Sequence, residues 1–308
     1  MSPESAAVLA AAARFLGFVG TLLVVGAAAF RFGVARTIGP SVPFLAADGL
    51  HRAARLGAAS GLVLLGALPL KLFAQARSFL ESGEPLTREL LGAVLGTAWG
   101  KGWKAQAVAG ILVVAGFTAA RLRPWPGWLL AGLAATAVVL AAPLTGHAVG
   151  SDRGGAWGFP LNALHVLAGG AWLGTLAVVL VAGLPATRRD GLVDPGTVAN
   201  LIHAFSPIAL FSACIAILAG SVLGFLYLEG SIAALFASRY GRTLLLKLGA
   251  LAGVLSLGAY NWRIQRRRLD GMQGVAGLQR TAAAELTLGG ILLAVTAVLV
   301  ALPMPGED

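Results

Sequence analysis

The segment LLAGLAATAVVLAAPL at residues 129–144 decides the fold, because it is apolar on every face. A strand of a membrane barrel would alternate polar and apolar side chains with a period of two, and this segment does not. The rest of the chain has the same character. Of its 308 residues 57% are hydrophobic and 12% are charged, whereas about a quarter of the residues in a soluble domain are charged. The sequence therefore predicts an all-α, polytopic transmembrane helical bundle.

Apolar runs about 20 residues long, bounded by charged residues or by Pro and Gly, predict about eight membrane spans. We expect these spans in a single membrane domain over residues 1–308, at about 6–32, 50–73, 103–121, 126–147, 160–183, 204–228, 242–261 and 281–302. The first run has no cleavage site after a short apolar core, so we expect the first span to be retained. An even number of spans places both termini on one side.

The basic residues predict which side that is. Arg and Lys are more frequent in the odd-numbered loops, and the cluster RRRLD at 266–270 directly follows the seventh predicted span. Because cytoplasmic loops carry the excess of positive charge, both termini are predicted to be periplasmic. The formal net charge of +10 does not indicate a nucleic-acid partner, since the basic residues gather at span ends, where they contact lipid headgroups.

The second loop, at about 74–102, contains the amphipathic segment TRELLGAVLGTAW at 87–99. Thr87 is a suitable N-cap, and a helix would place one set of apolar residues on a single face: Leu90, Leu91, Val94, Leu95, Ala98 and Trp99. We therefore predict an interfacial helix on the outer surface. Trp99 and Trp103 at this interface, and Trp125 and Trp128 at the opposite one, are typical of aromatic belts.

Two histidines are the leading candidates for metal ligands. His147 closes the fourth predicted span and His165 lies about one turn into the fifth, so a short connection can bring both to one depth at the outer surface. Imidazoles in this arrangement bind a metal ion or a heme iron. Asp152 in the connection is a further ligand or hydrogen-bond acceptor, and Asn162 and Trp172 share the helical face of His165. The alternative is that each histidine is a hydrated interfacial residue.

A second set of candidates lies toward the cytoplasm. His51 precedes the apolar part of the second span, His203 precedes Pro207 in the sixth, and Glu285 lies within the eighth. They are possible inner ligands, because ionisable groups within a bilayer are costly unless they are paired or functional. Their structural alternatives are ordinary interfacial histidines and a glutamate paired with a basic side chain.

Two cations are predicted in the outer leaflet, Arg14 in the first span and Lys247 in the seventh. Without a carboxylate at their depth they require an anionic partner, which could be Asp152, a lipid phosphate or a heme propionate. Lys247 could instead extend its ammonium group to the interface.

Several chemistries lack support. The chain has one Cys and three Met residues, so no thioether ladder for Cu(I) crosses the membrane, and imidazole and oxygen ligands suited to Cu(II) are favoured. GxSxG, HExxH and Walker motifs are absent from the sequence, which gives no support to hydrolase chemistry or ATP-driven transport. We therefore do not expect an enzyme.

Four segments resemble the copper resistance protein D (CopD) family: TGHA at 145–148, NALHVLAGGAWLGTL at 162–176, FSPIALFS at 205–212, and YGRTLLLKLGAL at 240–251 followed by Asn261. The resemblance implies a bacterial inner-membrane protein that moves copper across or into the membrane. It also implies a periplasmic copper-binding partner of the CopC type.

The leading hypothesis is a copper transport or homeostasis protein that handles copper ions through histidine ligands. His147 and His165 would be outer ligands with Asp152, and His51, His203 or Glu285 would be inner ligands. The main alternative is a membrane b-type cytochrome with bis-histidine heme, in which Arg14 and Lys247 hold the propionates. The further alternative is a structural membrane subunit without a ligand.

Overall fold

The computed structural model describes residues 3–81, 83–146, 155–189, 192–269 and 271–305. Within these ranges eight helical segments are long and apolar enough to cross a membrane, which confirms the predicted all-α polytopic bundle. His147 and Asp152 lie outside the described residues.

The first four spans are α1 (Pro3–Ala29) continued by the π-helix η1 (Phe30–Val34) and α2 (Ala35–Ile38); α3 (Pro43–Arg77); α5 (Ala98–Leu122); and α6 (Pro124–Ala141) continued by the 3₁₀ turn η2 (Ala142–Thr145). The fifth span is α8 (Gly155–Gly169), η4 (Gly170–Gly174), α9 (Thr175–Val178), η5 (Val179–Gly183) and α10 (Leu184–Ala186). The last three spans are α11 (Pro195–Tyr227); α13 (Arg239–Arg263) with η6 (Gln265–Arg268); and α14 (Met272–Leu299). The other elements are α4 (Arg88–Gly96), α12 (Ile232–Ala237) and the antiparallel pair β1 (Arg188–Arg189) and β2 (Leu192–Val193).

Two of the helices that begin earlier than the apolar pattern predicts, α3 and α11, begin at a proline. Pro43 and Pro195 are in the first turns of α3 and α11, where the fixed φ of proline suits a helix and its missing N–H costs nothing. Asp194 caps α11, since its carboxylate accepts hydrogen bonds from the N–H groups of Gly196 and Thr197 and from the Thr197 hydroxyl. The Thr197 hydroxyl, followed by its N–H, holds the pKa of Asp194 below its usual value.

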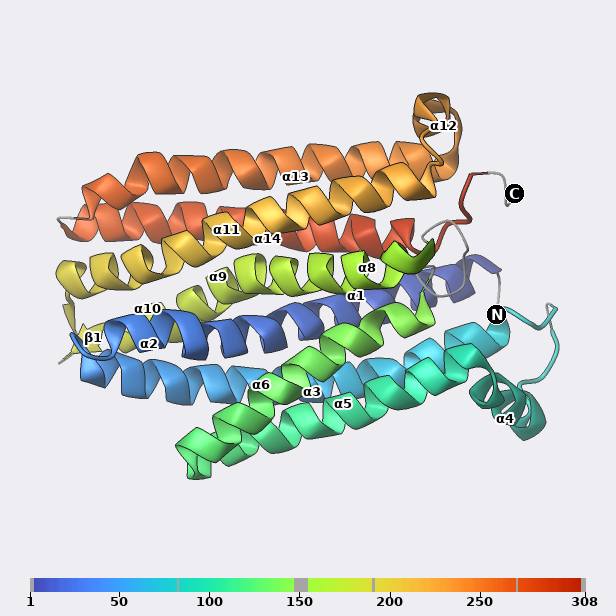
Figure 1. Ribbon diagram of the computed structural model, residues 1–308, viewed down its shortest axis with the longest axis horizontal. Helices are drawn as coiled ribbons and strands as arrows, with labels where there is room; N and C mark the ends of the chain where they lie inside the picture. The colour runs from blue at the N-terminus through green and yellow to red at the C-terminus, as the bar shows by residue number, and fades with distance from the viewer. Residues whose placement is uncertain (1–2, 82, 147–154, 190–191, 270, 306–308) are drawn as a thin grey trace.

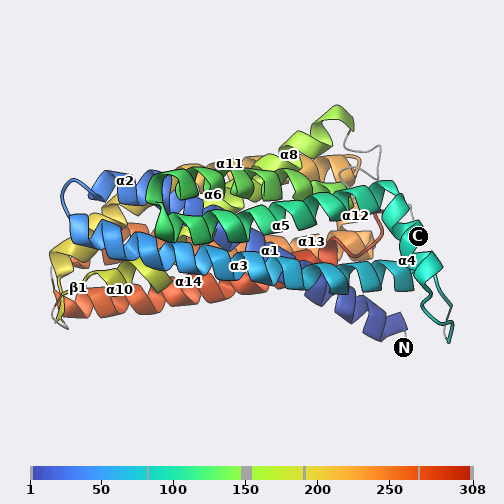
Figure 2. The same cartoon turned by 90° about the horizontal axis from the view of Figure 1, so that it is seen from below.

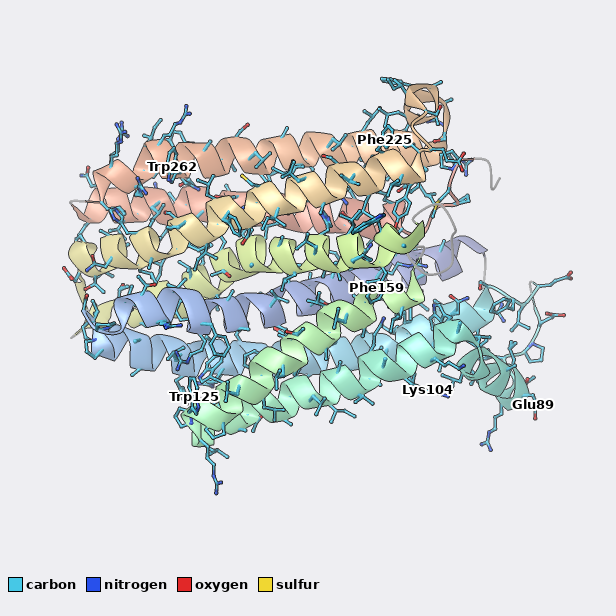
Figure 3. All side chains as sticks on the ribbon, viewed as in Figure 1. Glu89, Lys104, Trp125, Phe159, Phe225 and Trp262 are labelled. Carbon is cyan, nitrogen blue, oxygen red and sulfur yellow. The ribbon has the colours of Figure 1, made fainter. Side chains whose placement is uncertain are left out.

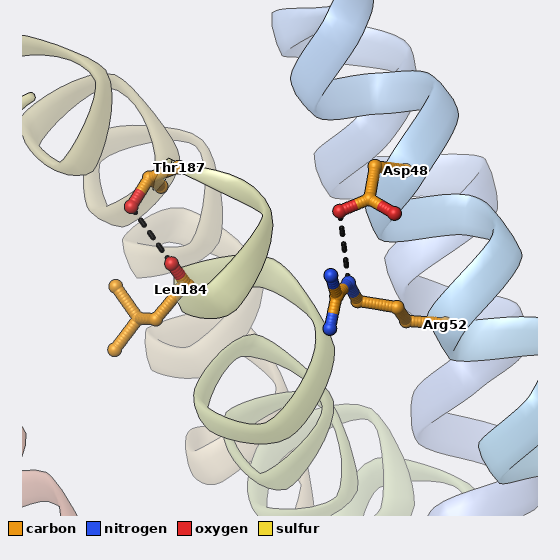
Figure 4. Close-up of polar contacts among 4 residues, drawn as sticks. All are labelled: Asp48, Arg52, Leu184 and Thr187. Atoms are coloured by element: carbon orange, nitrogen blue, oxygen red, sulfur yellow. Dashed lines mark hydrogen bonds and ion pairs between the residues drawn. The ribbon is translucent and has the colours of Figure 1, made fainter. Parts of the chain in front are cut away.

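Both termini, α4 and α12 lie at one end of the bundle, here called the terminal end (Figure 1). The connections at β1 and after α2 lie at the opposite end, which Figure 2 confirms from a second direction. Two local polar contacts lie at this opposite end (Figure 4): Arg52 Nε donates to Asp48 Oδ2 at 2.8 Å, and Thr187 Oγ1 donates to the Leu184 carbonyl at 2.7 Å. Figure 3 shows Trp125 and Trp262 toward the opposite end, and Glu89 and Lys104 toward the terminal end.

The first and fifth spans approach each other closely in the bundle core. Gly26 of α1 faces Gly174 of η4, and a Cβ atom on either glycine would overlap the backbone of the other helix. Small residues permit such approaches in membranes, where packing and hydrogen bonding drive helix association. The contact coincides with η4, one of two π-helical turns in the fifth span, and turns of this kind are frequent at functional sites.

The interfacial helix is confirmed as α4, with its N-cap. The Leu90 N–H donates to Thr87 Oγ1 at 3.2 Å, and Val94 is buried. The predicted continuation through Ala98 and Trp99 is wrong. Thr97 has an extended backbone and accepts from the Gly100 N–H at 3.1 Å, so it begins α5, and both residues belong to that helix.

Trp128 is also not part of an aromatic belt. It is 2% exposed, and its ring meets that of Phe117 edge to face at 5.5 Å between centroids. The neighbouring Trp125 is 60% exposed, as a belt residue requires. The apolar pattern marks a tryptophan near a span end, but helix packing decides which of two neighbours faces the core.

Candidate functional site

His165 occupies a built position at the terminal end of the bundle. It lies on α8, half-buried, with its Nδ1 2.8 Å from the carbonyl oxygen of Ala216 on α11. A carbonyl oxygen only accepts, so the tautomer that forms this hydrogen bond carries its proton on Nδ1 and leaves a lone pair on Nε2. Metal-binding histidines commonly have this arrangement, in which a backbone carbonyl fixes one ring nitrogen and the other is the ligand.

The absence of a side chain at Gly220 makes room for this ring. A Cβ atom at Gly220 would lie 2.8 Å from His165 Cε1 and 2.9 Å from Nδ1, closer than real Cβ contacts. Ala216 and Gly220 are one helical turn apart on α11, so the same face of α11 supplies both the hydrogen-bond acceptor and the space. The imidazole therefore has a position defined by two features of a neighbouring span.

Lys247 of α13 lies near this imidazole. Its ammonium group exerts a repulsive electrostatic effect on positive charge at His165. Among the described residues no carboxylate lies within ion-pair distance of Lys247, so the prediction that this cation needs an anionic partner still stands. Asn162, one turn before His165, lies beside Tyr227 of α11, so it lies between the same two helices.

Arg14 belongs to a different polar group. It lines a small cavity of about 60 Å³ together with Lys71 and Gln106. Lys71 Nζ donates to Gln106 Oε1 at 2.9 Å and to Thr145 Oγ1 at 2.8 Å, and Gln106 Nε2 donates to the Ala141 carbonyl at 2.9 Å. From the sequence, Lys71 is only one of the basic residues near span ends, and no role inside the bundle is predicted for it. The polar residue Gln106 in the third span is the feature that could have indicated this group.

Glu285 is buried, 4% exposed, and its partner is an amide and not a basic residue. Asn261 Nδ2 donates to Glu285 Oε2 at 2.8 Å, and the side chain of Trp172 lies beside this carboxyl group. Trp172 was predicted to continue the face of His165. It lies in η4, where a π turn changes the helical register, and it contacts Glu285.

His51 and His203 lie toward the end opposite the termini, near the starts of α3 and α11 respectively, and both are exposed. Over the described ranges no group of three or more His, Cys, Asp or Glu side chains is arranged to hold a metal ion. The structure thus positions His165 and Glu285 in the bundle and leaves His51 and His203 on its surface.

These features define an eight-span, multi-pass membrane protein with few polar groups inside the bundle. The chain belongs to the copper resistance protein D (CopD) family. Residues 4–159 match the N-terminal domain described as copper resistance protein D-like, and residues 199–299 match copper resistance protein D. The resemblance found in the sequence is thereby confirmed.

A curated relative agrees with this family. The chain is 29% identical over 256 residues to the copper transport protein CutJ of Bacillus subtilis (strain 168). The match covers 81% of this chain and 45% of CutJ, so the chain spans about half the length of this relative. No solved structure matches the chain. Family membership supports a role in copper transport or handling.

Proposed function

We propose that this protein transports copper ions across the bacterial inner membrane and is not an enzyme. In this proposal both termini are periplasmic, and copper enters at the terminal end from a periplasmic copper-binding protein of the CopC type. The observation that carries the proposal is His165, whose Nδ1 is fixed by the Ala216 carbonyl while Nε2 retains its lone pair. An imidazole oriented in this way is a suitable ligand for a copper ion.

Electrostatics determine what else the outer site requires. The positive charge of Lys247 near His165 opposes a cation at Nε2, so an anionic ligand must offset it. Asp152 is the proposed source of this charge and His147 the proposed second imidazole, both in the connection that leads into α8. His51, His203 and Glu285 remain proposed inner ligands. Since copper is the cargo, binding must be weak enough for release.

The test is uptake of radioactive copper by proteoliposomes containing the purified protein, together with an optical spectrum of the same sample. We expect His147→Ala and His165→Ala each to reduce uptake at least tenfold, because each removes one ligand of a shared centre. The double variant should be scarcely worse, since residues that act as a unit are not additive. Cys214→Ala, which changes an exposed thiol, is the matched control and should be silent.

Expression and helix content of the variants must match those of the unsubstituted protein. Additive losses in the double variant would indicate two separate sites. Unchanged uptake in His165→Ala would exclude this histidine from the copper route. A Soret band that disappears in the same variants would replace the copper proposal with the b-type cytochrome, in which Arg14 and Lys247 were predicted to hold the propionates.

A further inference from the structure

A second site lies in the half of the bundle opposite the termini. A cavity of about 400 Å³ separates the fifth span from α11, α13 and α14. Its floor includes the buried residues Trp172, Ala213, Asn261, Ala282 and Glu285, and its rim includes the exposed residues Leu210, Ala259, Trp262 and Arg263. Because exposed residues of membrane-spanning helices face lipid, the rim at Leu210, Ala259 and Trp262 opens the cavity toward the bilayer.

The floor of this cavity has an unsatisfied hydrogen-bond acceptor. Asn261 is 9% exposed, and its Nδ2 donates to Glu285, but its Oδ1 is buried without a hydrogen-bond partner. A buried acceptor without a partner is energetically costly, so this position favours a ligand that donates a hydrogen bond. Gly258 adds space here, since a Cβ atom at this position would lie 3.1 Å from Glu285 Oε1.

The remaining lining defines the rest of the ligand. Leu176, Leu255 and Leu278 give the walls an apolar surface, and the indole of Trp172 offers an aromatic face at the floor. A lipid acyl chain entering tail first would place a methyl group against Asn261 Oδ1 and leave it unsatisfied. A phosphate or carboxylate head would meet the Glu285 carboxyl group. A ligand that suits both the Asn261 acceptor and the apolar walls has a neutral hydroxyl group on an apolar, partly aromatic body.

We propose that this cavity binds a lipid-soluble phenolic molecule, whose hydroxyl group donates a hydrogen bond to Asn261 Oδ1 and whose apolar body fills the space between α11 and α13. The cavity does not include His165, the proposed entry site for copper, but Glu285, a proposed inner ligand, lies at its floor. Cross-linking of the phenol is measured without copper, so the result does not depend on whether the protein transports copper.

The experiment uses the full chain in lipid nanodiscs and a 4-alkylphenol that carries a photoreactive diazirine. Cross-linked peptides should map to the cavity-lining parts of α11, α13 and α14. Unlabelled 4-pentylphenol should compete, whereas 4-pentylanisole, which has the same body but no hydroxyl proton, should compete at least tenfold more weakly. Asn261→Leu should remove this preference, because it removes the acceptor.

A matched pair on α13 keeps the test independent of Asn261. Ala259 and Ala252 are both exposed and two helical turns apart, but only Ala259 lines the cavity. Ala259→Phe should block the rim and reduce cross-linking at least tenfold, and Ala252→Phe should leave it unchanged. Equal competition by phenol and anisole, or full cross-linking in Ala259→Phe, would overturn the proposal. Competition by oleic acid without competition by 4-pentylphenol would assign the cavity to a lipid acyl chain and also overturn it.

Discussion

The role of His165 can be tested without changing His165 itself. In Gly220→Ala the new Cβ atom would lie 2.8 Å from His165 Cε1 and 2.9 Å from Nδ1. Ordinary contacts begin at 3.4 Å, so the ring must move by about 0.6 Å or the two helices must separate. Either response stretches or breaks the 2.8 Å hydrogen bond to Ala216, which contributes about 0.5–1.5 kcal/mol to stability.

The larger effect is expected on the affinity for copper. Losing the group that orients a histidine ligand typically weakens metal affinity about 10–100-fold, and we expect a loss in that range for Gly220→Ala. The assay is equilibrium copper binding to the purified protein in detergent, with a chelator competing for the metal. Helix content by circular dichroism confirms that the variant has folded.

Gly224→Ala is the control, one turn further along α11. Its Cβ atom would meet only Leu244 Cδ2, at 3.7 Å, which is ordinary van der Waals contact. Both substitutions raise helix propensity by about 1 kcal/mol, so a difference between them cannot come from the helix backbone. Wild-type copper affinity in a folded Gly220→Ala protein would refute the conclusion that the Ala216 carbonyl orients His165 as a ligand.

Three further predictions concern topology, the cap of α11 and the interfacial helix. Reporters fused after Arg268 should be cytoplasmic and those after Asp308 periplasmic; the reversed activities would invert every side assignment. Asp194→Ala should lower the thermal midpoint at pH 7, because the capping carboxylate stabilises the fold while it is ionised. The difference in midpoint from the unsubstituted protein should persist in mild acid and disappear only below the lowered pKa of Asp194. A pH-independent difference would mean that its charge is irrelevant. In a Cys214→Ala background, a cysteine at exposed Arg88 should react with a water-soluble thiol reagent and one at buried Val94 should not; equal labelling would contradict the orientation of α4.

The spans could be predicted from the sequence because bilayer thickness fixes their length and composition. The Thr87 cap of α4 could be predicted too, since capping depends on a few neighbouring residues. The π turns could not. They depend on how the fifth span packs against α1 at Gly26 and Gly174, and a hydropathy pattern contains no information about which helices become neighbours.

Polar residues inside the spans show the same difference between what the sequence reveals and what packing decides. A charged residue inside an apolar run is visible in the sequence, so Arg14, Lys247 and Glu285 were all identified as candidates. The residues that contact them could not be predicted from the sequence, because they lie on other helices. Glu285 pairs with Asn261, and Arg14 lies near Lys71, whose hydrogen bonds reach Gln106 and Thr145 on two further spans.

These pairings divide the polar groups of the bundle into two chemically different kinds. Arg14 and Lys71 line one small cavity, and Lys247 lies near the His165 imidazole, so positive charge predominates in these two polar groups. Toward the other end, the interior carries a carboxyl group, Glu285, with an amide partner. A copper ion that crosses this protein would therefore need an anionic ligand at its entry and would later meet the carboxyl group of Glu285. The connection containing Asp152 is the proposed source of the acid at entry. Asp152→Asn tests this directly: it should reduce copper uptake as severely as His165→Ala, whereas normal uptake would exclude Asp152 as the required anion.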